Sequence, residues 1–272
     1  MSSQPSPPSP LATAEPWDLV ANDYSAELLP MFEHFSKLAL QLVRVPAGGY
    51  VLDVATGPGT LALLAAAQEC NVSALDFSEQ MLHNLKQRAA AAKLTALEVR
   101  QGDGQALPFA DGRYDAAFSM FGLMFFPDRN QGFKELLRVL KPGGRAVVSS
   151  WAPLSGAFAS VMEAVRAMLP GLPFGQGKGP LSDRDEFAAE LRAAGFSSVE
   201  VHTELHTLQA PSLKEFWESC QRTTAPIVLL RRKLGEEHWQ QLAAGVEQRL
   251  RNEFGEGPIA ITATAHLGIG MK

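Results

Sequence analysis

Two glycines follow a short apolar stretch early in the chain. Residues 50–55 are apolar apart from Asp53, and the stretch leads through Gly57 and Gly59 into a helical apolar pattern. Glycine has no Cβ and adopts positive φ at little cost, so the backbone of such a turn can approach a ligand closely. We predict that this turn joins a strand to a helix and binds a ligand.

An acidic residue, Asp76, ends the next apolar stretch. Its carboxylate could accept hydrogen bonds from both hydroxyls of an unsubstituted ribose, which indicates a nucleoside ligand such as adenosine. The spacing Gly57-x-Gly59-x-x-Ala62 also fits the glycine pattern of NAD enzymes. The turn alone therefore leaves both kinds of nucleotide open.

Two histidines, His202 and His206, have a spacing similar to that of metal ligands. The sequence around them predicts a strand, on which they would lie about 13 Å apart, too far for one ion. The only cysteines, Cys70 and Cys220, form no metal-binding spacing. We predict no metal site.

Alternating apolar strands and helical patterns must position these residues. We predict strands over 50–55, 71–76, 96–101, 113–119 and 144–151, with helices near 59–69, 78–92 and 128–140 between them. Such alternation is typical of βαβ units and a parallel sheet, which brings the carboxyl ends of the strands to one edge. The glycine turn and Asp76 should meet there.

The remaining segments complete one predicted domain over 17–272. Proline-rich residues 1–16 are expected to form a disordered tail. The domain then comprises cap helices over 17–48, a cofactor-binding core over 49–151 and a C-terminal part over 152–272, in which a helical insertion over about 212–254 serves as a lid between the last two strands.

Composition favours a small-molecule ligand. The net charge is −5 and no long basic run occurs, so nucleic acid is disfavoured as a partner. Apolar stretches are too short for a membrane span, and the N-terminus lacks the features of a signal peptide, which predicts a cytoplasmic protein. No pattern indicates an oligomeric state.

The flanking residues resemble the class I S-adenosylmethionine-dependent methyltransferases, in the small-molecule branch (methyltransferase type 11) that includes ubiquinone and menaquinone biosynthesis enzymes. The resemblance is clear over 17–151 and looser beyond. The blocks that carry it are Val51-Leu-Asp-Val-Ala-Thr-Gly-Pro-Gly59, Ala74-Leu-Asp-Phe-Ser-Glu-Gln-Met81, Gln101-Gly-Asp-Gly-Gln-Ala-Leu-Pro-Phe109, Tyr114-Asp115 with Ser119, and Leu137-Arg-Val-Leu-Lys-Pro-Gly-Gly144.

The resemblance implies an α/β fold: a doubly wound, mostly parallel seven-stranded sheet of the Rossmann-like methyltransferase type. The family's seventh strand is antiparallel and is reached through a hairpin, which predicted strands at 198–209 and 259–270 could supply. The resemblance also implies the cofactor, S-adenosyl-L-methionine, and a set of cofactor-binding residues: Tyr24, Asp53, Gly57, Gly59, Asp76, Phe77, Met81, Gly102, Asp103, Gly104 and Ser119.

Within that set the resemblance gives most positions a role. The two glycines of the turn would flank the methionine portion, with Asp53 beneath them, and Tyr24 would fold over the same end. Asp76 would bind the ribose, and Asp103 would accept from the adenine amine. Phe77 and Met81 would border the adenine.

Three functions stay open. The first is methyl transfer to a carbon, oxygen or nitrogen of a small molecule, for which no catalytic residue can be named without the acceptor. The second is an NAD-dependent oxidoreductase, although such enzymes usually have an apolar residue in place of Asp53 and no reason for an acidic Gly102-Asp103-Gly104. The third is a catalytically silent methyltransferase-like binding protein.

Overall fold

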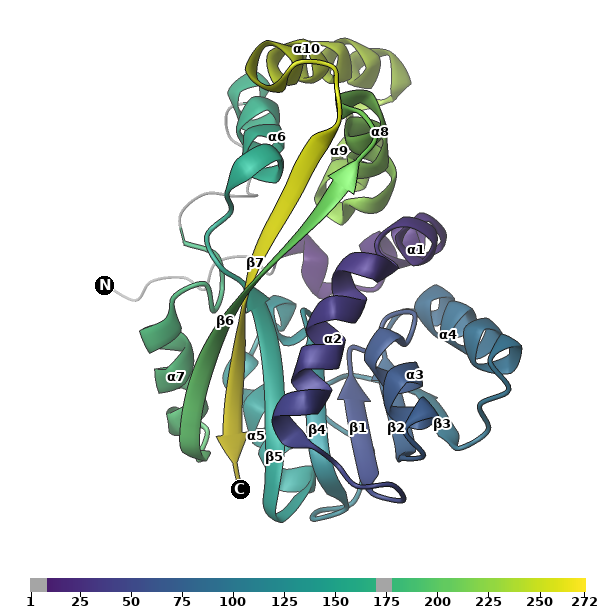
Figure 1. Ribbon diagram of the computed structural model, residues 1–272, viewed down its shortest axis with the longest axis vertical. Helices are drawn as coiled ribbons and strands as arrows, with labels where there is room; N and C mark the ends of the chain where they lie inside the picture. Colours follow the sequence, from purple (N-terminus) through teal and green to yellow (C-terminus); the bar gives the residue numbers. More distant parts are fainter. Residues whose placement is uncertain (1–8, 170–177) are drawn as a thin grey trace.

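The computed structural model describes residues 9–169 and 178–272, which form one seven-stranded sheet in the order β3-β2-β1-β4-β5-β7-β6 (Figure 1). β1 to β5 run parallel, whereas β7 is antiparallel to both of its neighbours. This confirms the predicted Rossmann-like methyltransferase fold. The strands are β1 Tyr50–Val54, β2 Asn71–Asp76, β3 Leu97–Gln101, β4 Tyr114–Met120, β5 Leu140–Trp151, β6 Ser197–Ala210 and β7 Ile259–Met271.

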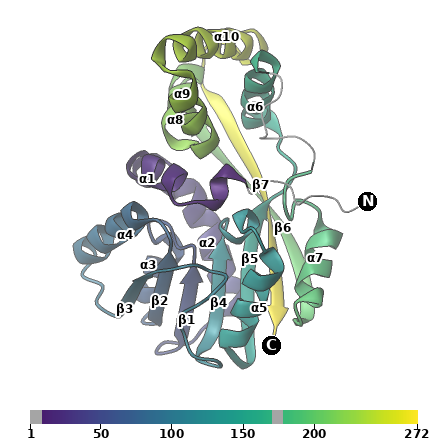
Figure 2. The ribbon, with the colours of Figure 1, turned by 180° about the vertical axis from the view of Figure 1, so that it is seen from behind.

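Helices cover both faces of the sheet. α2, α3 and α4 lie on one face, and α5 and α7 lie on the other, which is seen in Figure 2. Strands covered on both faces are buried nearly end to end, as the continuous apolar runs of β1 and β2 require. The helices are η1 Pro10–Ala12, α1 Glu15–Glu27, α2 Leu29–Val43, α3 Thr60–Ala67, α4 Glu79–Ala91, η2 Leu123–Phe125, α5 Arg129–Val139, α6 Gly156–Met168, α7 Arg184–Ala193, α8 Leu213–Thr223, α9 Ala225–Leu234 and α10 Glu236–Phe254.

The N-terminal segment is folded from residue 9, so the predicted tail over 1–16 is wrong for 9–16; residues 1–8 lie outside the described part. Leu11 is buried, and the Trp17 indole Nε1 donates a hydrogen bond to its carbonyl at 3.0 Å. Pro10 and Pro16 lie in the first turns of helices. Backbone N–H groups there have no acceptor within the helix, so the missing N–H of proline costs no hydrogen bond. Proline content alone therefore overestimated the length of the tail.

A helical unit lies beyond the carboxyl edge of the sheet. β6 and β7 extend past the end of β5 as a two-stranded ribbon, and α8, α9 and α10 connect their far ends (Figure 1). α6 joins them around a core that includes the buried Trp217 and Trp239. The predicted insertion over 212–254 thus consists of three helices. No described helix is long and apolar enough to cross a membrane.

Candidate cofactor site

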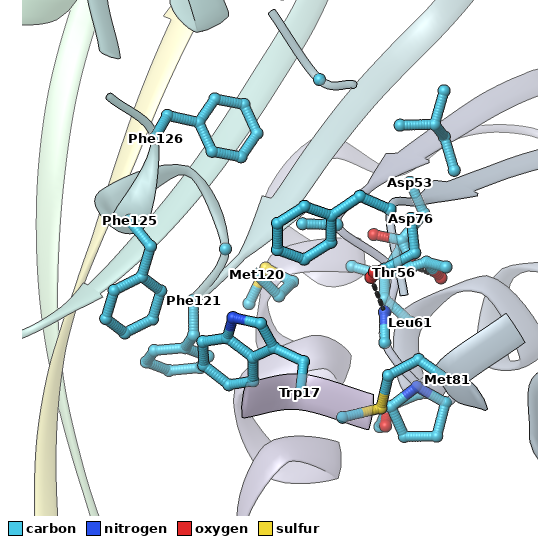
Figure 3. Close-up of a pocket in the computed structure, with 18 of the residues that line it drawn as sticks. Trp17, Asp53, Thr56, Leu61, Asp76, Met81, Met120, Phe121, Phe125 and Phe126 are labelled. Carbon is cyan, nitrogen blue, oxygen red and sulfur yellow. Dashed lines mark hydrogen bonds between the residues drawn. The ribbon is translucent and has the colours of Figure 1, made fainter. Parts of the chain in front are cut away.

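A cavity of about 260 Å³ opens at the carboxyl edge of the sheet. The strand order reverses between β1 and β4, which is where ligands bind in doubly wound sheets. η1, α1 and α2 form its roof and one wall. Figure 3 shows Asp53, Asp76 and Thr56 on one side of the cavity and the aromatic rings of Phe121, Phe125 and Phe126 on the other.

In the glycine turn after β1, every second residue has a positive φ: 55° at Ala55, 55° at Gly57 and 79° at Gly59. A Cβ on Gly57 would face open space, with the Met81 sulfur 4.0 Å away. A Cβ on Gly59 would instead lie 2.6 Å from the Leu85 side chain. Gly57 lines the cavity and Gly59 does not. The missing Cβ of Gly59 lets α4 pack against the turn, and the role of Gly59 in cofactor binding stays a prediction.

Alanine substitutions at Gly57 and Gly59 should separate binding from folding. Both incur backbone strain of about 1 kcal/mol. Gly59→Ala must also displace Leu85 and should lower the free energy of unfolding in urea by about 2 kcal/mol more than Gly57→Ala. Gly57→Ala should weaken S-adenosylhomocysteine binding in calorimetry by about tenfold. Equal losses of stability would contradict the packing role of Gly59.

Asp53 lies buried beneath this turn, with 1% of its surface exposed. Its Oδ2 accepts hydrogen bonds from Thr56 Oγ1 at 2.7 Å and from the Ala62 amide at 3.1 Å. Its Oδ1 has no partner among the described residues. Burial raises the pKa of Asp53 to about 7, although these two bonds partly oppose the rise. A buried carboxylate with a free oxygen favours a cationic ligand.

Asp76 ends β2 and faces the turn. Its Oδ2 accepts from the Gly57 amide at 2.8 Å and its Oδ1 from the Ser78 amide at 2.9 Å. Burial raises its pKa to about 6, against the lowering effect of these bonds. Each carboxylate oxygen has two lone pairs, so both can still accept from a ligand in the cavity that Asp76 lines.

Asp103 lies in the loop that follows β3. Its Oδ1 accepts from the backbone amide and the side-chain Nε2 of Gln105, at 2.8 and 3.1 Å. Gln105 thereby fixes the orientation of the carboxylate at the cavity. A Cβ on the adjacent Gly104 would collide with Phe126, so this position requires glycine for close packing, and Gly102 also lines the cavity.

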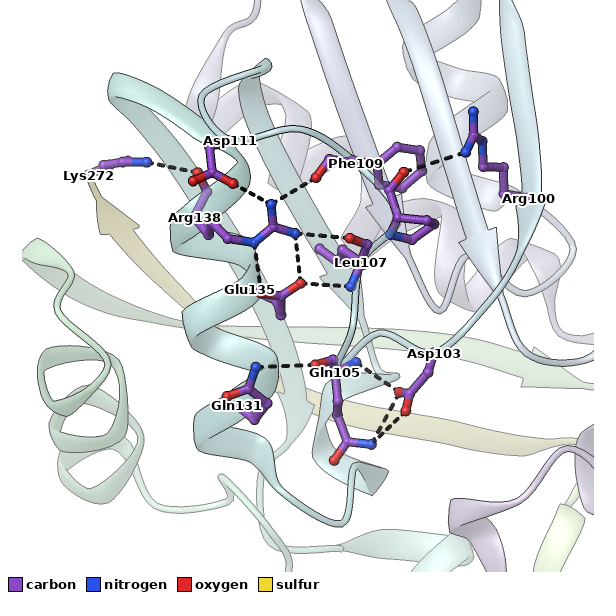
Figure 4. Close-up of polar contacts among 11 residues, drawn as sticks. Arg100, Asp103, Gln105, Leu107, Phe109, Asp111, Gln131, Glu135, Arg138 and Lys272 are labelled. Atoms are coloured by element: carbon purple, nitrogen blue, oxygen red, sulfur yellow. Dashed lines mark hydrogen bonds and ion pairs between the residues drawn. The ribbon is translucent and has the colours of Figure 1, made fainter.

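An ion-pair network fixes the same loop to α5 (Figure 4). Glu135 accepts from the Leu107 amide at 2.7 Å and from the Arg138 Nε at 2.8 Å. The Arg138 guanidinium also donates to the carbonyls of Leu107 and Phe109, at 2.9 and 2.8 Å. Arg138 holds the pKa of Glu135 below its ordinary value. The network positions the backbone from which Asp103 projects.

Arg138→Met should destabilise the protein. It leaves two loop carbonyls and the Glu135 carboxylate without their partner, and we expect the free energy of unfolding to fall by about 2 kcal/mol. Urea denaturation measures this. Arg192→Met on the exposed side of α7 is the matched control and should change little. A similar effect of both substitutions would show that the network contributes nothing specific.

The other predicted residues divide in two groups. Tyr24, Phe77 and Met81 line the cavity. Ser119 does not: it is fully buried, and its hydroxyl accepts from the Leu123 amide at 3.1 Å. This side chain therefore supports the turn after β4, and the role of Ser119 as a cofactor ligand stays a prediction.

Sequence patterns missed much of the cavity wall. Leu11, Trp17 and Phe32 come from η1, α1 and α2, and no local motif marks them as cavity residues. No residue of the insertion over 212–254 is among the described residues that line the cavity, and its role as a lid stays a prediction. The insertion packs instead on α1, where Arg222 pairs with Glu27 at 2.8 Å.

The histidines of β6 have separate partners. His202 Nε2 lies 3.2 Å from a Glu200 oxygen, whereas the His206 ring stacks on His34 with a centroid distance of 4.0 Å. Within residues 9–169 and 178–272, no group of three or more His, Cys, Asp or Glu side chains is arranged to hold a metal ion.

The charged side chains that line the described part of the cavity are all acidic. Asp53, Asp76 and Asp103 are the charged residues among the described lining residues, and no lysine, arginine or histidine accompanies them. Such a cavity suits a ligand that carries positive charge and hydroxyl or amine donors. It is poorly suited to a pyrophosphate.

Sheet order and cavity position are those of the Rossmann-like methyltransferase fold. Residues 51–144 match the protein-family model described as a methyltransferase domain. The matched segment begins at β1 and ends inside β5, so it includes the glycine turn, Asp76 and Asp103.

Curated relatives match part of the chain. An uncharacterized protein of Mycobacterium bovis is 33% identical over 153 residues, which is 56% of this chain and 55% of the relative. The ubiquinone/menaquinone biosynthesis C-methyltransferase UbiE of Geotalea uraniireducens is 38% identical over 116 residues, 41% of this chain and 49% of the enzyme. The chain thus spans about half the length of these relatives.

Solved structures share the fold. YcgJ from Bacillus subtilis is 19% identical, with a TM-score of 0.60 over 88% of this chain and 98% of that one. The [4+2]-cyclase SpnF is 17% identical, with a TM-score of 0.61 over 99% and 98%. A Haemonchus contortus phosphoethanolamine N-methyltransferase solved with S-adenosyl-L-methionine is 18% identical, with a TM-score of 0.55 over 88% and 52%.

Proposed function

We propose that this protein transfers a methyl group from S-adenosyl-L-methionine to a small-molecule acceptor. The observation that carries the proposal is Asp76 at the tip of β2, hydrogen-bonded to the Gly57 amide at 2.8 Å and facing a cavity whose charged lining is entirely acidic. A ribose diol can donate to this carboxylate, and a sulfonium and an ammonium group match the acidic lining.

The residues present fit this cofactor. Asp53 offers its unpartnered buried oxygen on the side of the glycine turn, where the proposed methionine end would lie. Tyr24 from α1 lines the same cavity, where burial and the charge of Asp76 raise the pKa of its hydroxyl. Asp103, oriented by Gln105, would accept from the adenine amine. Phe77 and Met81, with Gly102 and Gly104, would border the adenine.

The bound cofactor supplies an activated methyl group on a sulfonium. The contribution of the chain is to hold the acceptor in line with that group and to exclude water from it. Trp17 and Tyr24 from α1 and Phe32 from α2 enclose the cavity from above, which makes these two helices the proposed cover. No histidine or lysine lines the cavity in the described residues, so the carboxylates are the groups there that could accept a proton from an acceptor hydroxyl or carbon.

Ligand binding distinguishes this proposal from an NAD-dependent oxidoreductase. S-adenosylhomocysteine should raise the melting temperature by several degrees and should bind in calorimetry, whereas NADH should do neither. Stabilisation by NADH alone would overturn the proposal. A methylation assay with pooled metabolites and a labelled methyl donor then tests turnover, since a cyclase also has this fold.

Cofactor binding should weaken at acidic pH. The raised pKa values, about 7 for Asp53 and about 6 for Asp76, mean that both groups take up protons as the pH falls from 8 to 5.5. Donors and cations of the ligand prefer the ionised carboxylates, so binding is linked to proton release and the affinity for S-adenosylhomocysteine should fall by at least about tenfold. Calorimetry at each pH measures this. In Asp53→Asn, the affinity should change less with pH near 7, where Asp53 titrates. An affinity of the native chain that stays constant from pH 8 to 5.5 would contradict the proposed roles of the two carboxylates.

The acceptor class and location complete the proposal. A small-molecule acceptor rather than a nucleic acid is supported by the net charge of −5 and the absence of cationic lining residues in the described part. A cytoplasmic location is part of the same proposal.

A further inference from the structure

β6 is an edge strand, at the end of the sheet opposite β3 (Figure 1). It pairs with β7 on one side only, and this pairing is regular from Glu200 to Ala210. Proteins usually protect such an edge with lysine, proline or a bulge, because its unpaired backbone groups can bind another strand. Residues 200–210 contain neither lysine nor proline, and the one irregularity of the pairing lies before them.

The hydrogen-bond pattern shows which backbone groups of β6 point away from the sheet. The carbonyl of Thr264 in β7 accepts from the Ala152 amide after β5, so even-numbered residues of β7 bond toward β5 and odd-numbered ones toward β6. Ala265 is paired with Glu204, so the even-numbered residues of β6 bond β7. The odd-numbered residues of β6 therefore direct their N–H and C=O groups outward.

Most of these outward groups have no partner in the described part of the chain. The carbonyl of Val201 accepts from Arg184 Nη2 at 2.7 Å, which agrees with the orientation. No described residue bonds the outward backbone groups of Thr203, Leu205 or Thr207. The Leu205 side chain is also 59% exposed, the largest fraction among the exposed large hydrophobic residues described. A second strand could pair here without displacing Arg184.

The central stretch of this edge is complementary to itself in the antiparallel direction. It reads Thr203-Glu-Leu-His-Thr207. If a two-fold axis passes through Leu205, this leucine lies opposite its own copy, and Thr203 lies opposite Thr207 of the second copy. Glu204 then lies opposite His206 of the second copy, in a pair without backbone hydrogen bonds, where side chains are closest. No like charges meet in this register.

The side chains of the stretch are already held in place. The hydroxyls of Thr203 and Thr207 each bond a side chain of β7 at 3.0 Å. Glu204 Oε1 lies 2.9 Å from His34 Nε2, and its other oxygen has no partner among the described residues. The His206 ring stacks on the same histidine. A second copy would therefore meet an ordered edge and lose little side-chain entropy.

We propose that the protein forms a symmetric dimer through β6, in which two seven-stranded sheets join into one with Leu205 on the two-fold axis. Backbone hydrogen bonds between the outward groups supply the affinity, and the Glu204–His206 and Leu205 contacts set the register. A register with Thr203 on the axis would also pair glutamates with histidines, but the Val201 carbonyl would then have to leave Arg184. The dimer does not depend on the proposed function.

Sedimentation velocity of the full chain tests the dimer. Pairing along one edge buries a small area, so we expect a dissociation constant in the micromolar range and, at about 100 μM protein, a mass about twice 29.3 kDa. A monomer at this concentration would overturn the proposal and would point to a strand of a different protein as the occupant of the edge.

Leu205→Lys tests the position of the contact. It places like charges opposite each other on the axis and should raise the dissociation constant by at least about tenfold. Leu154→Lys, at a leucine that is 47% exposed, is the matched control and should not change it. Equal dimerisation of both variants, with the fold intact by circular dichroism, would overturn the proposal.

Cysteine cross-linking tests the register. Leu205→Cys should form a disulfide between subunits on mild oxidation, because paired residues of antiparallel strands have Cα atoms about 5.5 Å apart. Thr203→Cys alone should not, since its two copies would lie roughly 13 Å apart along the strands, whereas Thr203→Cys combined with Thr207→Cys should. The native Cys70 and Cys220 are buried. Cross-linking by Thr203→Cys alone, or none by Leu205→Cys, would overturn the placement of Leu205 on the axis.

Discussion

Asp76→Ala is expected to weaken S-adenosylhomocysteine binding by more than about 100-fold. The substitution removes both acceptors for the ribose diol, and each hydrogen bond to a charged group contributes about 1.5–3 kcal/mol. It also leaves the Gly57 and Ser78 amides without their acceptors, so the glycine turn loses its support from β2. Calorimetry of the purified variant measures the affinity.

Two further variants control for folding. Asp76→Asn keeps one carbonyl acceptor and the shape of the side chain, so its affinity should lie between those of Asp76→Ala and the native chain. Asp111→Ala removes a largely exposed carboxylate on the network of Arg138, away from the cavity, and should leave affinity unchanged. If Asp76→Ala retains native affinity while the melting temperature changes, the ribose assignment is wrong.

Asp53→Asn is expected to stabilise the free protein and to weaken cofactor binding. Burial raises the pKa of Asp53 from 3.8 to about 7, so the ionised form is disfavoured by folding. Asparagine can still accept from Thr56 and Ala62 through its carbonyl, without a charge. We expect the free energy of unfolding at pH 8 to rise by about 1–3 kcal/mol and the affinity for S-adenosylhomocysteine to fall by about tenfold or more.

The stabilisation by Asp53→Asn should depend on pH. The cost of ionising Asp53 is absent below the unfolded pKa of 3.8, grows as the pH rises, and is complete above the folded value of about 7. The stabilisation by Asp53→Asn should therefore be present in urea denaturation at pH 8 and nearly gone at pH 4. A variant that is less stable than the native chain at pH 8 would show that the carboxylate has a partner in solution.

Much of the fold could be predicted because its signals are local. Apolar runs that end in glycine or aspartate marked β1 and β2, and the Ser182-Asp183 pair marked the start of α7, where the Asp183 side chain accepts from the Glu186 amide. The start of β5 was predicted less accurately: the strand was expected to begin at Gly144, but it begins at Leu140 and includes Lys141-Pro-Gly. The register with β4 shifts between Tyr114 and Ala116, which accommodates these residues.

The candidate site was predictable only where one motif carries both position and chemistry. Asp76 and Gly57 lie close together because adjacent parallel strands end at one edge, which the spacing in the sequence already implies. Gly59 shares the motif, but its requirement for glycine comes from Leu85 in another helix. Ser119 likewise lies on the right strand, with its side chain directed into the turn.

The aromatic wall of the cavity could not be predicted for a related reason. Trp17, Phe32 and Phe121 are far apart in the sequence, and each resembles an ordinary core residue within its own element. Only the packing of α1 and α2 over the end of β4 brings them to one cavity. Proline content similarly concealed Leu11, since an apolar residue between prolines gives no periodic signal.

A crystal structure of the protein grown with S-adenosylhomocysteine tests the central claim most directly. We expect the nucleoside in the cavity at the carboxyl edge of the sheet, with both ribose hydroxyls within about 3 Å of the Asp76 carboxylate and the amino-acid end beside Gly57. An empty cavity at saturating ligand, or a nucleoside whose ribose does not touch Asp76, would contradict it.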